Sequence, residues 1–121
     1  MSKLVLGCIV LLVFLGACGS SSEVGGLRLS LSPTSLQVGD NQVEVAIVDP
    51  QGKAVSDAEV SLEAVHKTMR MERNVVNCSG GEEGRYQGTV KTAHSGSWVI
   101  LVEVSRGGRR LGRAEFPVEV K

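Results

Sequence analysis

Apolar and polar residues alternate with a period of two along most of this chain, and this alternation limits its possible folds more than any other feature. Successive side chains of a β-strand point to opposite faces, so a period-two pattern predicts strands that bury one face. Turn residues interrupt the pattern, as in Asp49-Pro50-Gln51-Gly52, where proline fixes φ and glycine tolerates a positive φ. The expected strands cover residues 27–32, 42–48, 59–66, 85–90, 98–104 and 115–120.

No segment shows the 3.6-residue stripe of an amphipathic helix. About seven short strands with turns between them predict an all-β fold, an immunoglobulin-like antiparallel β-sandwich. Residues 98–104, WVILVEV, are apolar on both sides and should form a central strand, whereas Pro117 suits an edge strand because proline cannot donate to a ladder. The expected core residues are Val43, Val45, Ile47, Leu62, Tyr86, Val90, Trp98, Phe116 and Val118.

Residues 1–17 are typical of a secretory signal peptide. The basic residue Lys3 precedes an apolar run that is shorter than the roughly 20 residues of a membrane-spanning helix. The run ends in Leu15-Gly16-Ala17-Cys18, which resembles the lipobox of bacterial lipoproteins. The resemblance implies cleavage before Cys18 and attachment of palmitate-type acyl chains to it, so that lipid anchors the chain in a membrane. The alternative is a plain signal peptide that is cut elsewhere.

These features divide the chain into a signal peptide (1–17), a lipidated cysteine with a flexible tether (18–26) and one sandwich domain (27–121). The tether is expected because CGSSSEVGG is small, polar and without periodicity. Gly19, rather than aspartate, follows the cysteine, which by the sorting preference of enteric bacterial lipoproteins favours the outer membrane, facing the periplasm. The inner membrane and the cell surface remain alternatives within the cell envelope.

Charge and motif content exclude several classes of function. The chain has 13 basic and 13 acidic side chains and only 3% aromatic residues, so it offers no basic, aromatic surface for nucleic acid. It contains no phosphate-binding glycine loop, H-E-x-x-H pair or nucleophile elbow, so we expect no enzyme activity. With Cys8 removed and Cys18 lipidated, Cys78 has no partner for a disulfide.

The second half of the chain carries a pattern of aromatic residues and glycines. Tyr86 and Gly88 stand two residues apart, and Gly96 and Trp98 open a stretch of alternating valines. With the preceding segment DPQGKAVSDAEVSLEAV, these motifs resemble the YtkA-like domain and the related FixH-like exported proteins over about residues 40–108. All four residues also have a scaffold interpretation: two buried aromatics, a glycine that leaves room for an aromatic ring, and a glycine in a tight turn.

Relatives of this kind carry methionines and histidines after the third strand and are associated with copper handling and cytochrome oxidase maturation. The resemblance therefore implies a candidate metal site at Met69, Met71 and His66, with His94 as a further nitrogen ligand. Thioethers are soft ligands that favour Cu(I), and imidazole also suits copper. In a regular strand the two methionines share a face and His66 does not, so His66 joins them only if a turn intervenes.

The alternatives to a metal site stay open. Met69 and Met71 would serve equally as flexible fillers that cap the core, and Arg70 between them is electrostatically unfavourable for a cation. Cys78 is either a small buried residue or a ligand. The chain is therefore either an envelope-anchored module that binds or handles copper, or a non-metal module that docks another envelope protein.

Overall fold

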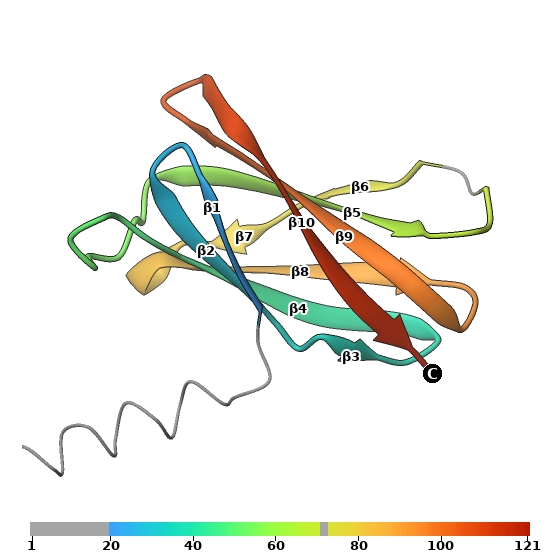
Figure 1. The fold of residues 1–121 in the computed structure, drawn as a ribbon. Helices are drawn as coiled ribbons and strands as arrows, with labels where there is room; N and C mark the ends of the chain where they lie inside the picture. The colour runs from blue at the N-terminus through green and yellow to red at the C-terminus, as the bar shows by residue number, and fades with distance from the viewer. Residues whose placement is uncertain (1–19, 71–72) are drawn as a thin grey trace, which may run out of the picture.

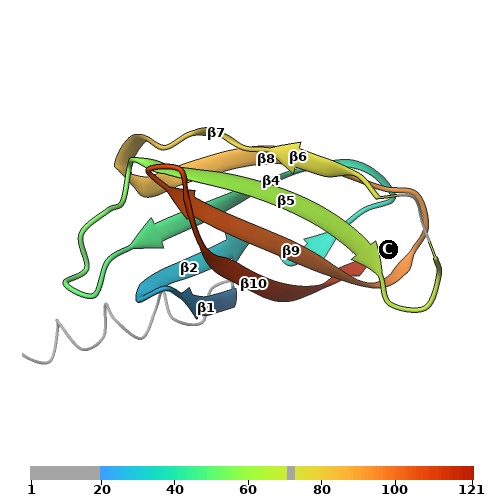
Figure 2. The same ribbon diagram turned by 90° about the horizontal axis from the view of Figure 1, so that it is seen from above.

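Two five-stranded sheets stack face to face in the computed structural model, which describes residues 20–70 and 73–121 (Figure 1). One sheet has the strand order β1-β2-β4-β8-β7, and the other has the order β3-β10-β9-β5-β6; Figure 2 shows the two layers from above. The strands are β1 (Ser20–Val24), β2 (Leu27–Ser32), β3 (Ser35–Leu36), β4 (Gly39–Val48), β5 (Ala58–His66), β6 (Val75–Asn77), β7 (Ser79–Gly80), β8 (Arg85–Thr92), β9 (Gly96–Arg106) and β10 (Arg109–Val120). The predicted all-β sandwich is confirmed.

The core lies between the two sheets and is built from the inward-facing residues of the long strands. Every residue that the alternation assigns to the core is buried there, and Trp98 and Phe116 are its largest fully buried side chains. Full burial of one large apolar side chain stabilises a fold by about 1.5–3 kcal/mol, so this alternation supplies most of the driving force. The core is completed by aliphatic residues of both sheets: Val24, Leu27, Leu29, Leu31, Leu36, Val55, Val60, Ile100, Val102, Val104, Ala114 and Val120.

The predicted central position of β9 is confirmed, whereas the strand of Pro117, β10, is not the outermost strand of its sheet because the short β3 lies beyond it. The apolar strand β9 lies between β10 and β5, at the centre of its sheet. The backbone nitrogen of Pro117 in β10 faces away from β9, toward the side on which β3 pairs only with Glu119 and Val120. Proline therefore stands on an edge that needs no N–H donor at that position.

The prediction of a flexible tether over residues 18–26 is wrong for residues 20–26, the part that the structure describes. Strand β1 pairs antiparallel with β2 along its whole length, and Val24 at its end is buried. Gly25 and Gly26 join the two strands with φ angles of 56° and 84°, as required in a tight two-residue hairpin turn. The polar composition concealed this strand because its edge position is held mainly by backbone hydrogen bonds, which serine forms as well as valine does.

The sandwich consequently begins at Ser20 and not at residue 27. Residues 20–121 contain both sheets and all of the described core, so this part of the chain can be studied as a domain. The signal peptide and Cys18 lie outside the described residues.

The described residues form more strands than the six whose ranges were predicted. Besides β1, the additional strands are β3, β6 and β7, each two or three residues long, which is too short to show alternation. A single 3₁₀ turn at Glu82–Gly84 precedes β8. Among residues 20–70 and 73–121, no helix has the length and apolar character needed to cross a bilayer.

One end of the sandwich brings together the end of β5, the β8–β9 turn and the C-terminus, on the right in Figures 1 and 2. Buried Thr92 closes this end by donating to the carbonyl oxygen of Gln37 at 2.8 Å and accepting from Asn41 Nδ2 at 3.1 Å. The β3–β4 connection is thereby tied to the end of β8. The candidate metal ligands fall at this same end.

Candidate functional site

Two turns lie side by side at this end of the sandwich. The first follows β5 and covers residues 67–70, and the second joins β8 to β9 over residues 93–95. The backbone N–H of Lys67 donates to the carbonyl oxygen of Ser97 at 3.0 Å, which holds the start of the first turn against β9.

His66, the last residue of β5, is buried between these turns and both of its ring nitrogens are occupied. Nε2 lies 3.2 Å from the carbonyl oxygen of Ser95; since a carbonyl only accepts, Nε2 carries the proton. Nδ1 accepts the backbone N–H groups of Thr68 and Met69, each at 3.1 Å. His66 therefore holds the two turns together as a neutral imidazole and has no lone pair left for a metal.

Trp98 and Gly96 complete this arrangement. Trp98 donates from Nε1 to the carbonyl oxygen of His94 at 2.9 Å, and its ring meets that of His66 edge to face. Gly96 has a φ of 127°, and a Cβ atom there would lie 2.9 Å from His66 Nε2. Glycine is required here both by the backbone conformation and by the close approach of the imidazole. The scaffold interpretation of Gly96 and Trp98 agrees with these contacts.

The other candidate ligands are on the surface or outside the described residues. Met69 is 41% exposed and the side chain of His94 is exposed, whereas Met71 lies outside the described part of the chain. Met69 does not cap the core, because it is exposed and is not among the residues packed against the core. Within residues 20–70 and 73–121, no group of three or more His, Cys, Asp or Glu side chains could hold a metal ion.

Cys78 stands between β6 and β7, where the chain crosses from one sheet to the other. Its N–H donates to the carbonyl oxygen of Val60 at 2.8 Å, and its half-buried thiol packs against the core. Burial raises the pKa of this thiol from 9.0 to about 11, because desolvation disfavours the thiolate. Its packing against the core and its raised pKa both agree with the interpretation of Cys78 as a small buried residue.

The remaining motif residues are also explained by packing. Tyr86 donates its hydroxyl proton to the carbonyl oxygen of Val55 at 2.7 Å and accepts the N–H of Ala58 at 3.1 Å, which fixes the β4–β5 connection. A Cβ atom on Gly88 would lie 2.9 Å from Leu62 Cδ1 and 3.2 Å from the sulfur of Cys78. Gly88 thus leaves room for an aliphatic side chain and a thiol. The prediction that it leaves room for an aromatic ring is wrong.

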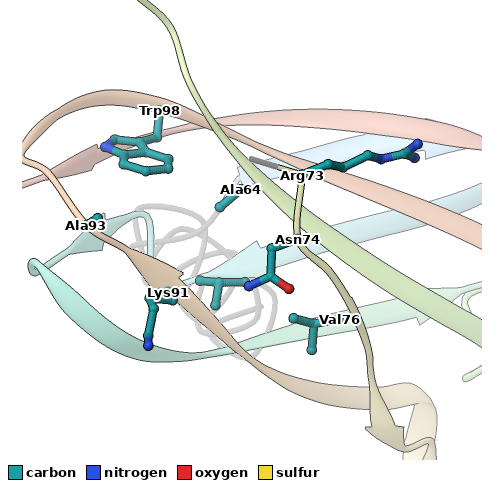
Figure 3. A pocket seen from close by; sticks show the side chains of 8 residues that line it. Ala64, Arg73, Asn74, Val76, Lys91, Ala93 and Trp98 are labelled. Carbon is teal, nitrogen blue, oxygen red and sulfur yellow. The ribbon is translucent and has the colours of Figure 1, made fainter. Parts of the chain in front are cut away.

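A groove with a volume of about 400 Å³ opens beside β8, between the two sheets (Figure 3). Its lining is mixed: Ala64, Val76, Val90, Ala93 and Trp98 are apolar, and Arg73, Asn74 and Lys91 are polar or charged. Arg73 points away from the cavity in Figure 3 and pairs with Glu63 at 3.2 Å.

Sequence reasoning missed this groove. Val90 and Trp98 were assigned to the core, which is correct, but no pattern in the sequence marks the cavity that reaches them. The cavity exists because β7 is too short to cover the full length of β8.

Comparison with known proteins identifies a family. The family model described as YtkA-like matches residues 22–103, a span that includes both turns and the groove. No curated protein matches the sequence at a significant level.

Solved structures resemble this one in fold. A DUF4426 family protein from Pseudomonas aeruginosa PAO1 has a TM-score of 0.58 at 15% identity, with 84% of this chain and 94% of that chain covered. The PmoD soluble domain from Methylocystis sp. (Rockwell) has a TM-score of 0.52 at 13% identity, covering 78% of this chain and 90% of that one. The Lin-41 filamin domain has the same TM-score and identity, covering 77% and 91%. At these identities the likeness concerns the sandwich fold alone.

Proposed function

Because the chain belongs to the YtkA-like family, we propose that it is an envelope protein, anchored by lipid on Cys18, that binds Cu(I) as cargo at the end of its sandwich. The observation that carries the proposal is the exposed thioether of Met69, on a turn held in place beside the turn of His94. Thioether and imidazole donors together suit Cu(I). Met71 remains a further thioether ligand that is expected from the sequence.

In this proposal His66 is a positioning residue and not a ligand. Its Nδ1 holds the backbone N–H of Met69, and its Nε2 holds the carbonyl oxygen of Ser95 next to His94. Loss of the imidazole would remove its hydrogen bonds to both turns and loosen them. The domain would then bind copper more weakly because the ligands would be less ordered, although no donor atom had been removed.

Positive charge near the site should weaken the binding of Cu(I). Lys67 and Arg70 are exposed in the same turn as Met69, and their positive charges oppose binding of a cation. The change Arg70→Gln should therefore strengthen Cu(I) binding, and the gain should be larger at low ionic strength because salt screens exposed charges.

The anchor would hold the domain close to the membrane. Only Gly19 separates Cys18 from Ser20, the first residue of β1, so the connection spans at most about 7 Å. Each buried methylene of an acyl chain contributes about 0.8 kcal/mol, so more than one chain gives firm attachment. Copper would therefore be exchanged with partners at the membrane surface.

Methionine-methyl NMR tests the ligands directly. Removal of the signal peptide removes Met1, so Met69 and Met71 give the two remaining methyl signals. Addition of Cu(I) should shift both signals and the ring signals of His94, while the ring signals of His66 change little. Copper-induced shifts confined to His66 or Cys78, or no shifts, would contradict the proposal.

A second candidate is a docking module without metal, favoured by the groove beside β8. This candidate requires neither methionine nor histidine.

A further inference from the structure

Strand β8 has an open edge along half of its length. It pairs with β4 from Arg85 to Thr92, but β7 covers it only at Tyr86 and Gln87. Among the described residues, no strand pairs with the outer side of β8 from Gly88 onward. An exposed strand edge is a template for another strand.

The backbone groups that face this open edge can be identified from the ladder. The carbonyl oxygen of Arg85 accepts from Gly81, just before β8, at 2.7 Å, so the polar groups of Arg85 face the β7 side. Pairing between β4 and β8 has no register shift, so every second residue of β8 faces the same way. Thr89 and Lys91 therefore each present an N–H and a C=O to the open edge.

The groove is lined by Val90 and Lys91 of this part of β8, and Figure 3 shows Lys91 beside it. Trp98, Val76 and Ala64 supply an apolar wall on the side of the opposite sheet. The side chain of Lys91 faces outward from the sandwich, because side chains alternate along β8 and its neighbours Val90 and Thr92 are buried. A strand added here would point alternate side chains into the groove, against this apolar wall, and toward the lysine.

We propose that this edge binds an extended, acidic segment of a partner protein by β-strand addition. Backbone hydrogen bonds to Thr89 and Lys91 would provide register, valine-sized side chains would enter the groove, and carboxylates would face Lys91. Of the two cationic lining residues, Arg73 pairs with Glu63, so the positive charge comes from Lys91; among the described residues the lining contains no anionic one.

A second copy of the chain is a poorer occupant. Antiparallel pairing of two β8 edges about Val90 would place both Lys91 side chains on the same face, and lysine on an edge strand opposes self-association. The surface is also independent of Met69 and His94, so its test does not depend on copper.

The test uses residues 19–121, labelled with ¹⁵N, and the peptide acetyl-Ser-Glu-Val-Glu-Val-Glu-Ser-amide. Binding should shift the amide signals of Gly88–Thr92 and slow solvent exchange at Thr89 and Lys91. The change Lys91→Pro removes the edge-facing N–H without touching the β4 ladder, and affinity should fall by at least about fivefold, as for loss of one backbone hydrogen bond.

Three controls separate the backbone contribution from charge and from folding. Thr89→Val keeps the N–H and should bind like wild type. Lys91→Gln should bind more weakly and with less salt dependence. A peptide with lysine in place of glutamate should not bind. The proposal is overturned if the amides of β8 do not respond to the acidic peptide, if its lysine counterpart binds equally well, or if a folded Lys91→Pro variant retains full affinity.

Discussion

The imidazole of His66 meets the indole of Trp98 edge to face, with ring centroids 5.1 Å apart and ring planes at 72°. The two residues are direct neighbours on β5 and β9, and each also binds a carbonyl oxygen of the β8–β9 turn. The pair thereby couples the turn that carries Met69 to the turn that carries His94. In the proposed copper site, the two rings would hold the ligand-bearing turns in place.

Replacement of His66 should destabilise the domain far more than replacement of His94. His66→Leu leaves the hydrogen-bonding groups of both turns without their partner, and a loss of about 1–3 kcal/mol is expected in urea unfolding. His94→Ala removes an exposed side chain and keeps the carbonyl that Trp98 uses, so a change within about 0.5 kcal/mol is expected. Equal losses for the two variants would show that His66 does not have this structural role.

Gly88 should tolerate no side chain unless Leu62 becomes smaller. The change Gly88→Ala places a methyl group 2.9 Å from Leu62 Cδ1, and overpacking of this kind costs about 1–3 kcal/mol. Combination with Leu62→Val removes the opposing methyl group, so the double variant should lose less stability than the two single changes together. Strict additivity in thermal or urea unfolding would contradict the observed packing.

Cys78 should react slowly at neutral pH. Burial raises the pKa of its thiol from 9.0 to about 11, so its alkylation by iodoacetamide should increase up to about pH 11, whereas the unfolded chain should level off near pH 9. Mass spectrometry of residues 19–121, in which Cys78 is the remaining cysteine, measures both rates.

The same shift makes stability depend on pH. Between pH 9 and about 11 the unfolded chain has lost the thiol proton and the folded chain has kept it, so the free energy of unfolding falls as pH rises through this window. The Cys78→Ala variant should not show the part of this fall in the free energy of unfolding that comes from the thiol. An identical alkaline profile in both proteins would contradict the raised pKa.

Sequence patterning predicted the long strands because each buries one face. Residues 27–32 were predicted with the bounds that the structure has, and β9 was correctly expected at the centre of its sheet. Strand β1 was missed because Ser20 and Ser22 lie at an edge where backbone pairing suffices. The crossing of the chain between sheets at Cys78 leaves no periodic signal.

The candidate site was predictable only in part. Parity showed that His66 could join the methionines only across a turn, and such a turn follows β5. That both of its nitrogens are used depends on contacts with Ser95 and Met69, which no local pattern reveals. The groove follows from the short length of β7, which composition cannot indicate.

Lipid on Cys18 is expected from the lipobox-like sequence before it. The change Cys18→Ala should leave an unprocessed or unanchored protein, and the wild-type chain should be recovered with membranes. Mass spectrometry of the mature N-terminus should find acyl chains on Cys18. An unmodified N-terminus in the wild-type protein would contradict the anchor.

Insertion of a ten-residue Gly/Ser segment after Gly19 tests the short connection. It should leave lipidation and folding unchanged but make the domain edge at Ser20 more accessible to protease. Equal protease sensitivity with and without the insertion would contradict close approach to the membrane.

Competition for Cu(I) against a chromophoric chelator is the most direct test of the proposed function. The double change Met69→Leu and Met71→Leu preserves volume and apolarity, so stability should change by less than about 1.5 kcal/mol per site. We predict that residues 19–121 take Cu(I) from the chelator in preference to Zn(II), and that the double variant binds Cu(I) at least about tenfold more weakly, a difference of about 1.4 kcal/mol. No uptake by the wild-type domain, or equal uptake by the double variant, would contradict the account.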